Sequence, residues 1–172
     1  MTRQASARPD LSLELVSNPI YLCAVREMMN LSAKRLGFTD AHASQIALAV
    51  DEAIVNVMKH GYDKKLDGRI WLRMTPLAAN RGGGDAKVTG VEIVIEDEAR
   101  QVEPECIKGR DLEDIRPGGL GVHIIREVMD EVCYQKRPGH DTGMRLTMVK
   151  KQNSDKGTAT NMPPNPCKSC DC

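Results

Sequence analysis

The sequence predicts a single α+β domain with a polar segment at each end. Three observations indicate this: some segments alternate apolar and polar residues as strands do, others repeat apolar residues at helical spacing, and two strand segments are joined by a glycine-rich connection. A chain of 172 residues with 41% hydrophobic content can fill one core. We therefore expect one domain over residues 11–151, with residues 1–10 and 152–172 disordered.

Each element follows from a local pattern. Asn18 and Pro19 are typical of a helix start, and Thr39 or Asp40 can cap a second helix. The segments GRIWLRMTPL and KVTGVEIVIED should be antiparallel neighbours, because the connection between them is of the hairpin kind. The predicted elements are, in order, a strand at 11–17, helices at 19–37 and 40–61, strands at 68–77 and 87–97, a helix from 121, and strands at 131–137 and 142–151.

Composition excludes some partners and indicates a compartment. The 24 basic and 24 acidic residues cancel, so charge alone would hold neither nucleic acid nor an anionic membrane. No stretch approaches the roughly 20 apolar residues of a membrane span, and the N-terminus has no secretory pattern. We expect a cytosolic protein with reduced thiols, in which the scattered cysteines at positions 23, 106 and 133 serve packing or are incidental.

One helix carries a polar stripe. Glu52, Asn56 and His60 recur every four residues, Lys59 lies beside them, and most other positions around this helix are apolar. A stripe that faces water is one interpretation. The other is a site for a ligand that carries a hard cation, in which Asn56 supplies an oxygen to Mg²⁺ and Glu52 accepts the proton of an attacking hydroxyl or water.

Three further features carry chemistry, each with an ordinary alternative. Asp97 ends an apolar strand, where it can form a turn or accept a hydrogen bond from an amino group such as that of adenine. Gly119 and Gly121 lead into a helix whose free backbone amides can bind phosphate, although a plain glycine turn looks the same. Thr142 heads the last strand, where threonine is common in any case.

Taken together and in this order, these elements resemble the GHKL (histidine-kinase-like) ATPase superfamily. The segments LAVDEAIVNVMKHGY and GGLGVHIIREVMDEVCY look like those of the anti-sigma-factor serine/threonine kinases of bacterial partner-switching systems. The resemblance implies a two-layer α/β sandwich of the Bergerat type. In that fold a mixed, mostly antiparallel sheet has three helices on one face, and ATP binds beside a flexible lid.

The resemblance also implies roles for single residues. Glu52 would be the catalytic base and Asn56 the magnesium ligand, Asp97 would accept a hydrogen bond from adenine, and Thr142 would support the adenine side. Gly119 and Gly121 would form the phosphate loop. His60 matches a recurring family histidine to which we assign no role. The implied partners are an anti-sigma-factor antagonist and a sigma factor or similar regulator, and the implied assembly is a homodimer.

Two features bear on how well such a site would work. The family usually has glycine two residues after the adenine-binding aspartate, whereas this chain has Ala99, whose methyl group could lie close to the purine and weaken binding. Residues 100–118 are polar and lack a steady period, which predicts a mobile lid. The cations of this lid that can meet a γ-phosphate are Lys108, Arg110 and Arg116.

Two functions of different classes are therefore open. One is a kinase that moves the γ-phosphate of ATP to a serine or threonine of an antagonist protein, and the other is a nucleotide-sensing anti-sigma binding module without turnover. A separate hypothesis concerns Cys167, Cys170 and Cys172, three thiols within six residues that would need one more ligand to complete a zinc site.

Overall fold

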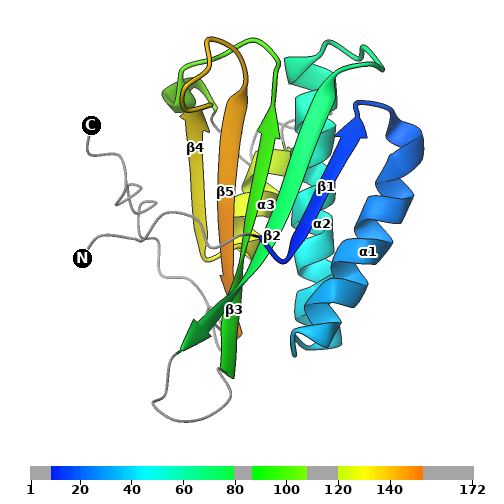
Figure 1. Cartoon of the computed structure of the whole chain (residues 1–172), viewed down its shortest axis with the longest axis vertical. Coiled ribbons are helices and arrows are strands. Elements are labelled where there is room, and N and C mark those ends of the chain that lie inside the picture. Colours follow the sequence, from blue (N-terminus) through cyan, green and yellow to red (C-terminus); the bar gives the residue numbers. More distant parts are fainter. Residues whose placement is uncertain (1–8, 80–86, 108–119, 153–172) are drawn as a thin grey trace.

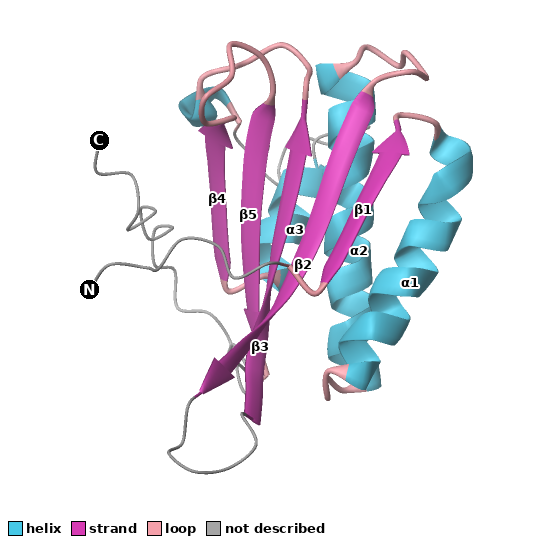
Figure 2. Ribbon diagram, in the orientation of Figure 1, coloured by secondary structure: helices cyan, strands magenta, loops and turns pink. Residues whose placement is uncertain are grey.

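The computed structural model describes residues 9–79, 87–107 and 120–152. Five strands form one sheet in the order β1-β2-β3-β5-β4, and three α-helices cover one face of it (Figure 1). Figure 2 shows the same two layers, with the helices behind the sheet. The elements are β1 (Leu11–Val16), η1 (Pro19–Tyr21), α1 (Leu22–Arg35), α2 (Asp40–Asn56), η2 (Val57–Gly61), β2 (Arg69–Ala79), β3 (Lys87–Asp97), η3 (Pro104–Cys106), α3 (Leu120–Val128), β4 (Glu131–Lys136) and β5 (Met144–Lys151).

The described sheet confirms the predicted α+β sandwich and is antiparallel at every pairing. β2 and β3 pair as expected, with Leu72 opposite Ile95. A mixed, mostly antiparallel sheet was expected, and the described sheet has antiparallel neighbours only. β4 runs parallel to β3, but β5 lies between them, so no two parallel strands are neighbours.

Side chains at the helix starts show why the helices begin where they do. The Asn18 side chain accepts a hydrogen bond from the Ile20 amide, and it opens a short 3-10 turn that leads into α1. Thr39, the first of the two predicted caps, accepts from the His42 amide at 3.2 Å. Gly37 adopts φ +94, a backbone conformation that glycine tolerates best, and so allows the chain to turn from α1 to α2.

The core lies between the sheet and the helices. It is made of alternate residues of the strands and the inner faces of α1 and α2, such as Ile70, Ile93, Met29 and Ile54, all fully buried. Lys150 is also buried, and its Nζ donates to the Val128 carbonyl at 2.9 Å, at the C-terminal end of α3. This ammonium therefore satisfies a free carbonyl at the helix end, where positive charge is favoured.

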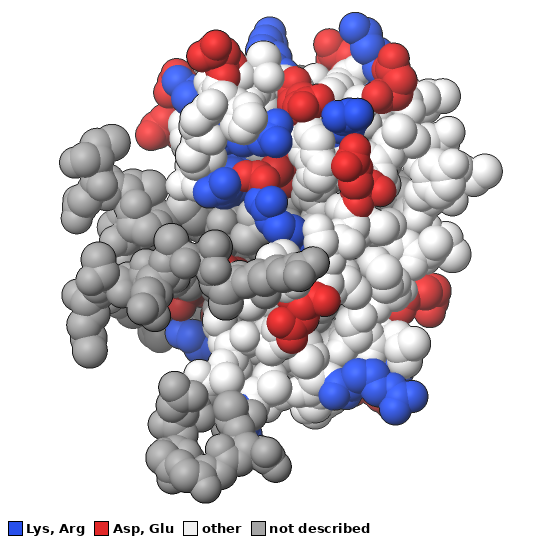
Figure 3. All heavy atoms as spheres, in the orientation of Figure 1, with Lys and Arg blue, Asp and Glu red and all other residues white. Residues whose placement is uncertain are grey.

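None of the helices in the described ranges lies on the other face of the sheet. Acidic and basic side chains gather there over the central strands (Figure 3). Glu96 of β3 is 4% exposed and pairs with both Arg73 and Arg145. Burial opposes the charge of Glu96, but the two guanidinium groups outweigh it and lower its pKa. The Arg137 guanidinium stacks 4.4 Å from the centre of the Trp71 ring.

Two sequence expectations concern the chain as a whole. Among the described residues, no helix has the length and apolar character that crossing a membrane requires. Cys23 is exposed and Cys133 is half-buried, and neither forms a disulfide within the described residues. The hairpin connection and the cysteine-bearing segment 153–172 lie outside the described residues.

Candidate functional site

Glu52 and Asn56 lie one turn apart on α2, where that helix packs against α3. Both are half-buried. Gly121, in the first turn of α3, lies directly against the pair: a Cβ atom on Gly121 would be 2.8 Å from Glu52 Oε2 and 3.1 Å from Asn56 Nδ2. The structure thus brings three of the predicted site residues together. Because position 121 is glycine, the Glu52 and Asn56 side-chain ends can lie directly against the first turn of α3.

The Asn56 carboxamide has unused hydrogen-bonding capacity. Its Nδ2 atom is buried and has no hydrogen-bond partner in the described part of the chain. A buried polar group left unpaired costs about 1–3 kcal/mol, so an acceptor for the Nδ2 donor would stabilise the site. A ligand at the α2–α3 contact would do so.

The oxygen atoms of Glu52 and Asn56, as distinct from the unpaired Nδ2 donor, fit a magnesium ion. Asn56 offers a carboxamide oxygen beside the Glu52 carboxylate, and Mg²⁺ commonly takes one or two protein oxygens and obtains the rest from phosphates and water. Within the described residues, no group of three or more histidine, cysteine, aspartate or glutamate side chains is arranged to hold a metal alone. A metal here would therefore need ligands from a bound phosphate.

Asp97 lies at the end of β3 and is 4% exposed. Its Oδ1 atom accepts from the Ala99 amide at 2.8 Å and from the Met144 amide at 3.2 Å. Burial raises the pKa of this carboxyl group, and the two amides and the nearby Arg137 offset that rise only in part. Asp97 is therefore an acceptor held in a fixed direction by the backbone of two strand ends.

The segment that contains Thr142 lies beside Asp97. The Gly143 amide donates to the Ala99 carbonyl at 2.7 Å, and a Cβ on Gly143 would lie 2.0 Å from the Asp97 carbonyl oxygen. Gly143 also adopts φ +89, so glycine is required here both for space and for conformation. Thr142, the predicted adenine-side residue, is exposed at this junction.

α2 does not continue as a regular α-helix to Gly61. Five residues, Val57–Gly61, form a π-helical turn, in which the Tyr62 amide donates to the Val57 carbonyl at 3.0 Å. The predicted single stripe of four polar residues is therefore wrong beyond Asn56, since a π turn changes the angular spacing of the side chains that follow. Lys59 and His60 are exposed, whereas Glu52 and Asn56 are half-buried against α3.

Sequence reasoning missed Tyr62. Its hydroxyl donates to the Arg69 carbonyl at 2.5 Å and accepts from the Glu98 amide at 2.8 Å, so it links the end of η2 to both β2 and the turn after β3. Burial raises the pKa of this phenol. A tyrosine that follows a buried helix needs a partner for its hydroxyl, and that need was the signal available in the sequence.

Some predicted residues cannot be placed. Gly119 and the lid cations Lys108, Arg110 and Arg116 lie outside the described residues. The start of the predicted lid is described, and it is anchored: Lys136 pairs with Glu103 at 2.6 Å, and Gln101 donates to the His140 carbonyl at 3.0 Å.

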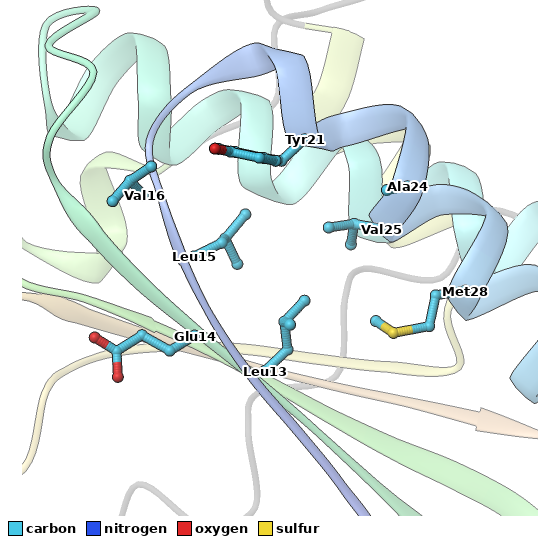
Figure 4. Close-up of a pocket in the computed structure, with 8 residues that line it drawn as sticks. All are labelled: Leu13, Glu14, Leu15, Val16, Tyr21, Ala24, Val25 and Met28. Carbon is cyan, nitrogen blue, oxygen red and sulfur yellow. The ribbon is translucent and has the colours of Figure 1, made fainter.

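A separate apolar groove lies between the edge strand β1 and helix α1 (Figure 4). It measures about 380 Å³ and is lined by Leu13, Leu15, Tyr21, Val25 and Met28, among others. Tyr21 is half exposed at 49%. The groove contains none of the predicted site residues, so the chemistry predicted above lies elsewhere in the fold.

Comparison with known sequences gives a consistent result. Residues 15–150 match the family described as the histidine kinase-like ATPase domain. A Listeria monocytogenes protein named serine-protein kinase RsbW is 28% identical over 146 residues, which is 85% of this chain and 89% of that protein. The Bacillus subtilis protein of the same name is 23% identical over 155 residues, covering 85% and 88% of the two chains.

One solved structure has the same fold. The crystal structure of the RsbU and RsbW domains of a Mycobacterium tuberculosis protein superposes with a TM-score of 0.52 at 16% identity. The match covers 86% of this chain but 33% of that one, so this chain corresponds to about a third of the solved protein. At this identity the likeness concerns the fold alone.

Proposed function

The chain belongs to the family of histidine kinase-like ATPase domains, and on that premise we propose that it is a protein serine/threonine kinase. It transfers the γ-phosphoryl group of ATP to a hydroxyl group of a partner protein. The relatives named serine-protein kinase RsbW support this activity, since they align over most of both chains.

The observation that carries the proposal is the contact of Glu52, Asn56 and Gly121 where α2 meets α3. A carboxylate, an unpaired carboxamide and the first turn of a helix converge there. Those are a proton acceptor, an oxygen ligand and a source of free backbone amides for phosphate. Phosphoryl transfer needs these three kinds of group, because its catalysis consists mainly of positioning and charge stabilisation.

In the proposed reaction the partner's hydroxyl oxygen bonds to the γ-phosphorus, and the bond to the β–γ bridging oxygen breaks. Glu52 accepts the hydroxyl proton, and ADP leaves with the electron pair of the broken bond. Mg²⁺, when bound, neutralises charge on the phosphate oxygens, and Asn56 is the residue that would hold it. Gly119 and Gly121 present backbone amides to the phosphates.

At the other end of the nucleotide, Asp97 accepts a hydrogen bond from the exocyclic amino group of adenine. Its fixed position supports this role, because its Oδ1 atom is held by two backbone amides. Thr142 supports the adenine side from the exposed junction before β5. The two ends are physically linked, since Gly61 at the end of η2 lies against Ala99.

We further propose that the phosphorylated partner is an anti-sigma-factor antagonist in a cytosolic partner-switching system. The unphosphorylated antagonist and a sigma factor or similar regulator would then compete for this chain. We also propose that the chain is a homodimer, in which the β1 edges of two copies pair. Support comes from β1 itself, which is an edge strand beside the apolar groove and carries Leu13 and Leu15 toward it.

The Glu52→Gln substitution tests the catalytic proposal. Glutamine keeps the shape of the side chain but cannot accept the proton, so transfer should fall by at least about a hundredfold, the scale of a general base. Binding of Mg-ATP, measured by calorimetry, should change by less than about threefold.

Transfer is followed with labelled ATP and a candidate antagonist protein as the acceptor. Retained transfer with weakened ATP binding would contradict the role of Glu52. Saturable ATP binding by the wild-type chain without any transfer would instead favour the binding module that acts without turnover.

A further inference from the structure

Ala99 packs against Gly61, the last residue of the π-helical turn that follows α2. It is 6% exposed, and a Cβ atom on Gly61 would lie 2.9 Å from the Ala99 Cβ atom. Real Cβ atoms essentially never come that close, so the Ala99 methyl group occupies the space that the missing Gly61 side chain leaves. The need for glycine at position 61 is spatial, because its φ is not among the positive values of the described residues.

The turn that contains Ala99 is held from several directions. The Ala99 amide donates to Asp97 Oδ1 at 2.8 Å, and the Ala99 carbonyl accepts from the Gly143 amide at 2.7 Å. The Glu98 amide donates to the Tyr62 hydroxyl at 2.8 Å. The first contact comes from the end of β3, the second from the residue before β5, and the third from the residue after the π-helical turn.

We propose that Gly61 and Ala99 form a steric pair that sets the position of the Asp97 acceptor against the π-helical turn. Ala99 is then a positioning residue for recognition of the adenine base, and its methyl group points to Gly61. This inference rests on the proposed nucleotide site. It assigns a structural role to Ala99, where the family resemblance implied glycine.

The pair makes a specific prediction about nucleotide selectivity. Asp97 can accept a hydrogen bond from the amino group of adenine, whereas guanine presents a carbonyl oxygen at the same place. The triphosphate contacts are common to ATP and GTP. A change that loosens the acceptor turn should therefore weaken ATP and leave GTP nearly unaltered, which a general loss of stability would not do.

Three variants test the pair: Ala99→Gly, Gly61→Ala, and the double variant that carries both substitutions. Ala99→Gly removes the methyl contact and frees the backbone of the turn. We expect the ratio of ATP to GTP affinity, measured by calorimetry with magnesium, to fall by about three- to tenfold. A tenfold fall corresponds to about 1.4 kcal/mol of binding free energy.

Gly61→Ala places two methyl groups in the space for one. We expect it to lower the melting temperature by several degrees, since about 1 kcal/mol corresponds to roughly 2–4 °C in a chain of this size. The double variant moves the methyl group from one side of the contact to the other. It should regain a melting temperature within about 2 °C of wild type and most of the lost selectivity.

Two results would overturn the inference. If Ala99→Gly binds ATP more tightly than wild type, the methyl group obstructs the purine and does not position the turn. If the double variant melts no higher than Gly61→Ala, the two residues are not a steric pair. A wild-type chain that binds neither nucleotide would refute the proposed nucleotide site instead, and the melting temperatures would still decide whether the pair exists.

Discussion

At the scale of single residues, Glu96 and Asp97 show how neighbours on one strand acquire opposite properties. They alternate to opposite faces of β3. Glu96 meets Arg145 and Arg73 on the open face, and they lower its pKa despite its burial. Asp97 points toward the end of the core, where burial raises its pKa and backbone amides are its nearest partners. Glu96 therefore stabilises the sheet through its ion pairs, while Asp97 is a hydrogen-bond acceptor fixed in position by backbone amides.

The raised pKa of Asp97 predicts that its negative charge lowers the stability of the fold, although ATP binding needs the carboxylate. An ionised, buried carboxylate costs folding free energy at pH 7. That cost disappears as the pH falls through the raised pKa, because the folded state then binds the proton. Asp97→Asn keeps the Oδ1 acceptor for both amides but removes the charge. The free energy of unfolding should rise by roughly 0.5–2 kcal/mol at pH 7, while ATP affinity falls.

Urea unfolding at pH 7 and near pH 4 measures this effect. The advantage of Asp97→Asn over wild type should shrink at the lower pH, because the raised pKa makes the folded wild-type chain take up the proton more readily than the unfolded chain. A variant that is less stable than wild type at pH 7 would show that the charge of Asp97 is stabilised by its surroundings, contrary to the direction of its pKa shift.

At the scale of elements, Gly121 sets how closely the Glu52 and Asn56 side chains approach the start of α3. A Cβ atom there would meet the ends of two flexible side chains, Glu52 and Asn56, and no buried backbone. Gly121→Ala should therefore displace those side chains without unfolding the helix, since alanine also favours a helix by about 1 kcal/mol over glycine. We expect the melting temperature to stay within roughly 4 °C of wild type, while phosphoryl transfer falls at least about a hundredfold.

Transfer assays and thermal melting on the same preparation check this prediction. The two readouts separate the possible outcomes. Unchanged transfer would mean that Glu52 and Asn56 do not act where α3 begins. A large loss of stability together with activity would mean that the helices themselves move apart, and that Gly121 has a structural role only.

The elements also show what could be predicted locally. The caps at Asn18 and Thr39, the strand alternation of β1 and the pairing of β2 with β3 all follow from patterns within a few residues. The π-helical turn does not follow from such a local pattern. Five residues are too few to distinguish a π turn by periodicity, and its position is tied to Tyr62, whose hydroxyl binds β2 and the turn after β3.

At the scale of the whole molecule, the site depends on contacts between distant segments. Glu52 and Asn56 were predictable as a pair from helical spacing, and Asp97 from its place at a strand end. Their assembly was not, because Gly121 reaches α2 and Gly143 reaches Asp97 through tertiary packing. The order of the strands also depends on tertiary packing. β5 lies between β3 and β4, and no local pattern in the sequence indicates this order.

The exposed edge of this sheet predicts how two copies assemble. β1 is an edge strand of the described sheet, and an exposed edge beside apolar side chains pairs readily with another strand. An antiparallel pairing of β1 with its own copy is self-complementary, as a twofold interface requires. Leu13→Lys places a charge at the half-buried centre of this surface, and we expect it to convert a dimer to a monomer.

Size-exclusion chromatography with light scattering measures the mass of each form. Leu48→Lys is the matched control, because Leu48 is an exposed leucine on α2 at 40% exposure and does not line the groove. The control should remain dimeric, and circular dichroism should show that both variants are folded. A monomeric wild-type chain, or a Leu13→Lys variant that stays dimeric, would contradict pairing through β1. In either case the groove beside α1 would have to bind something other than a second copy.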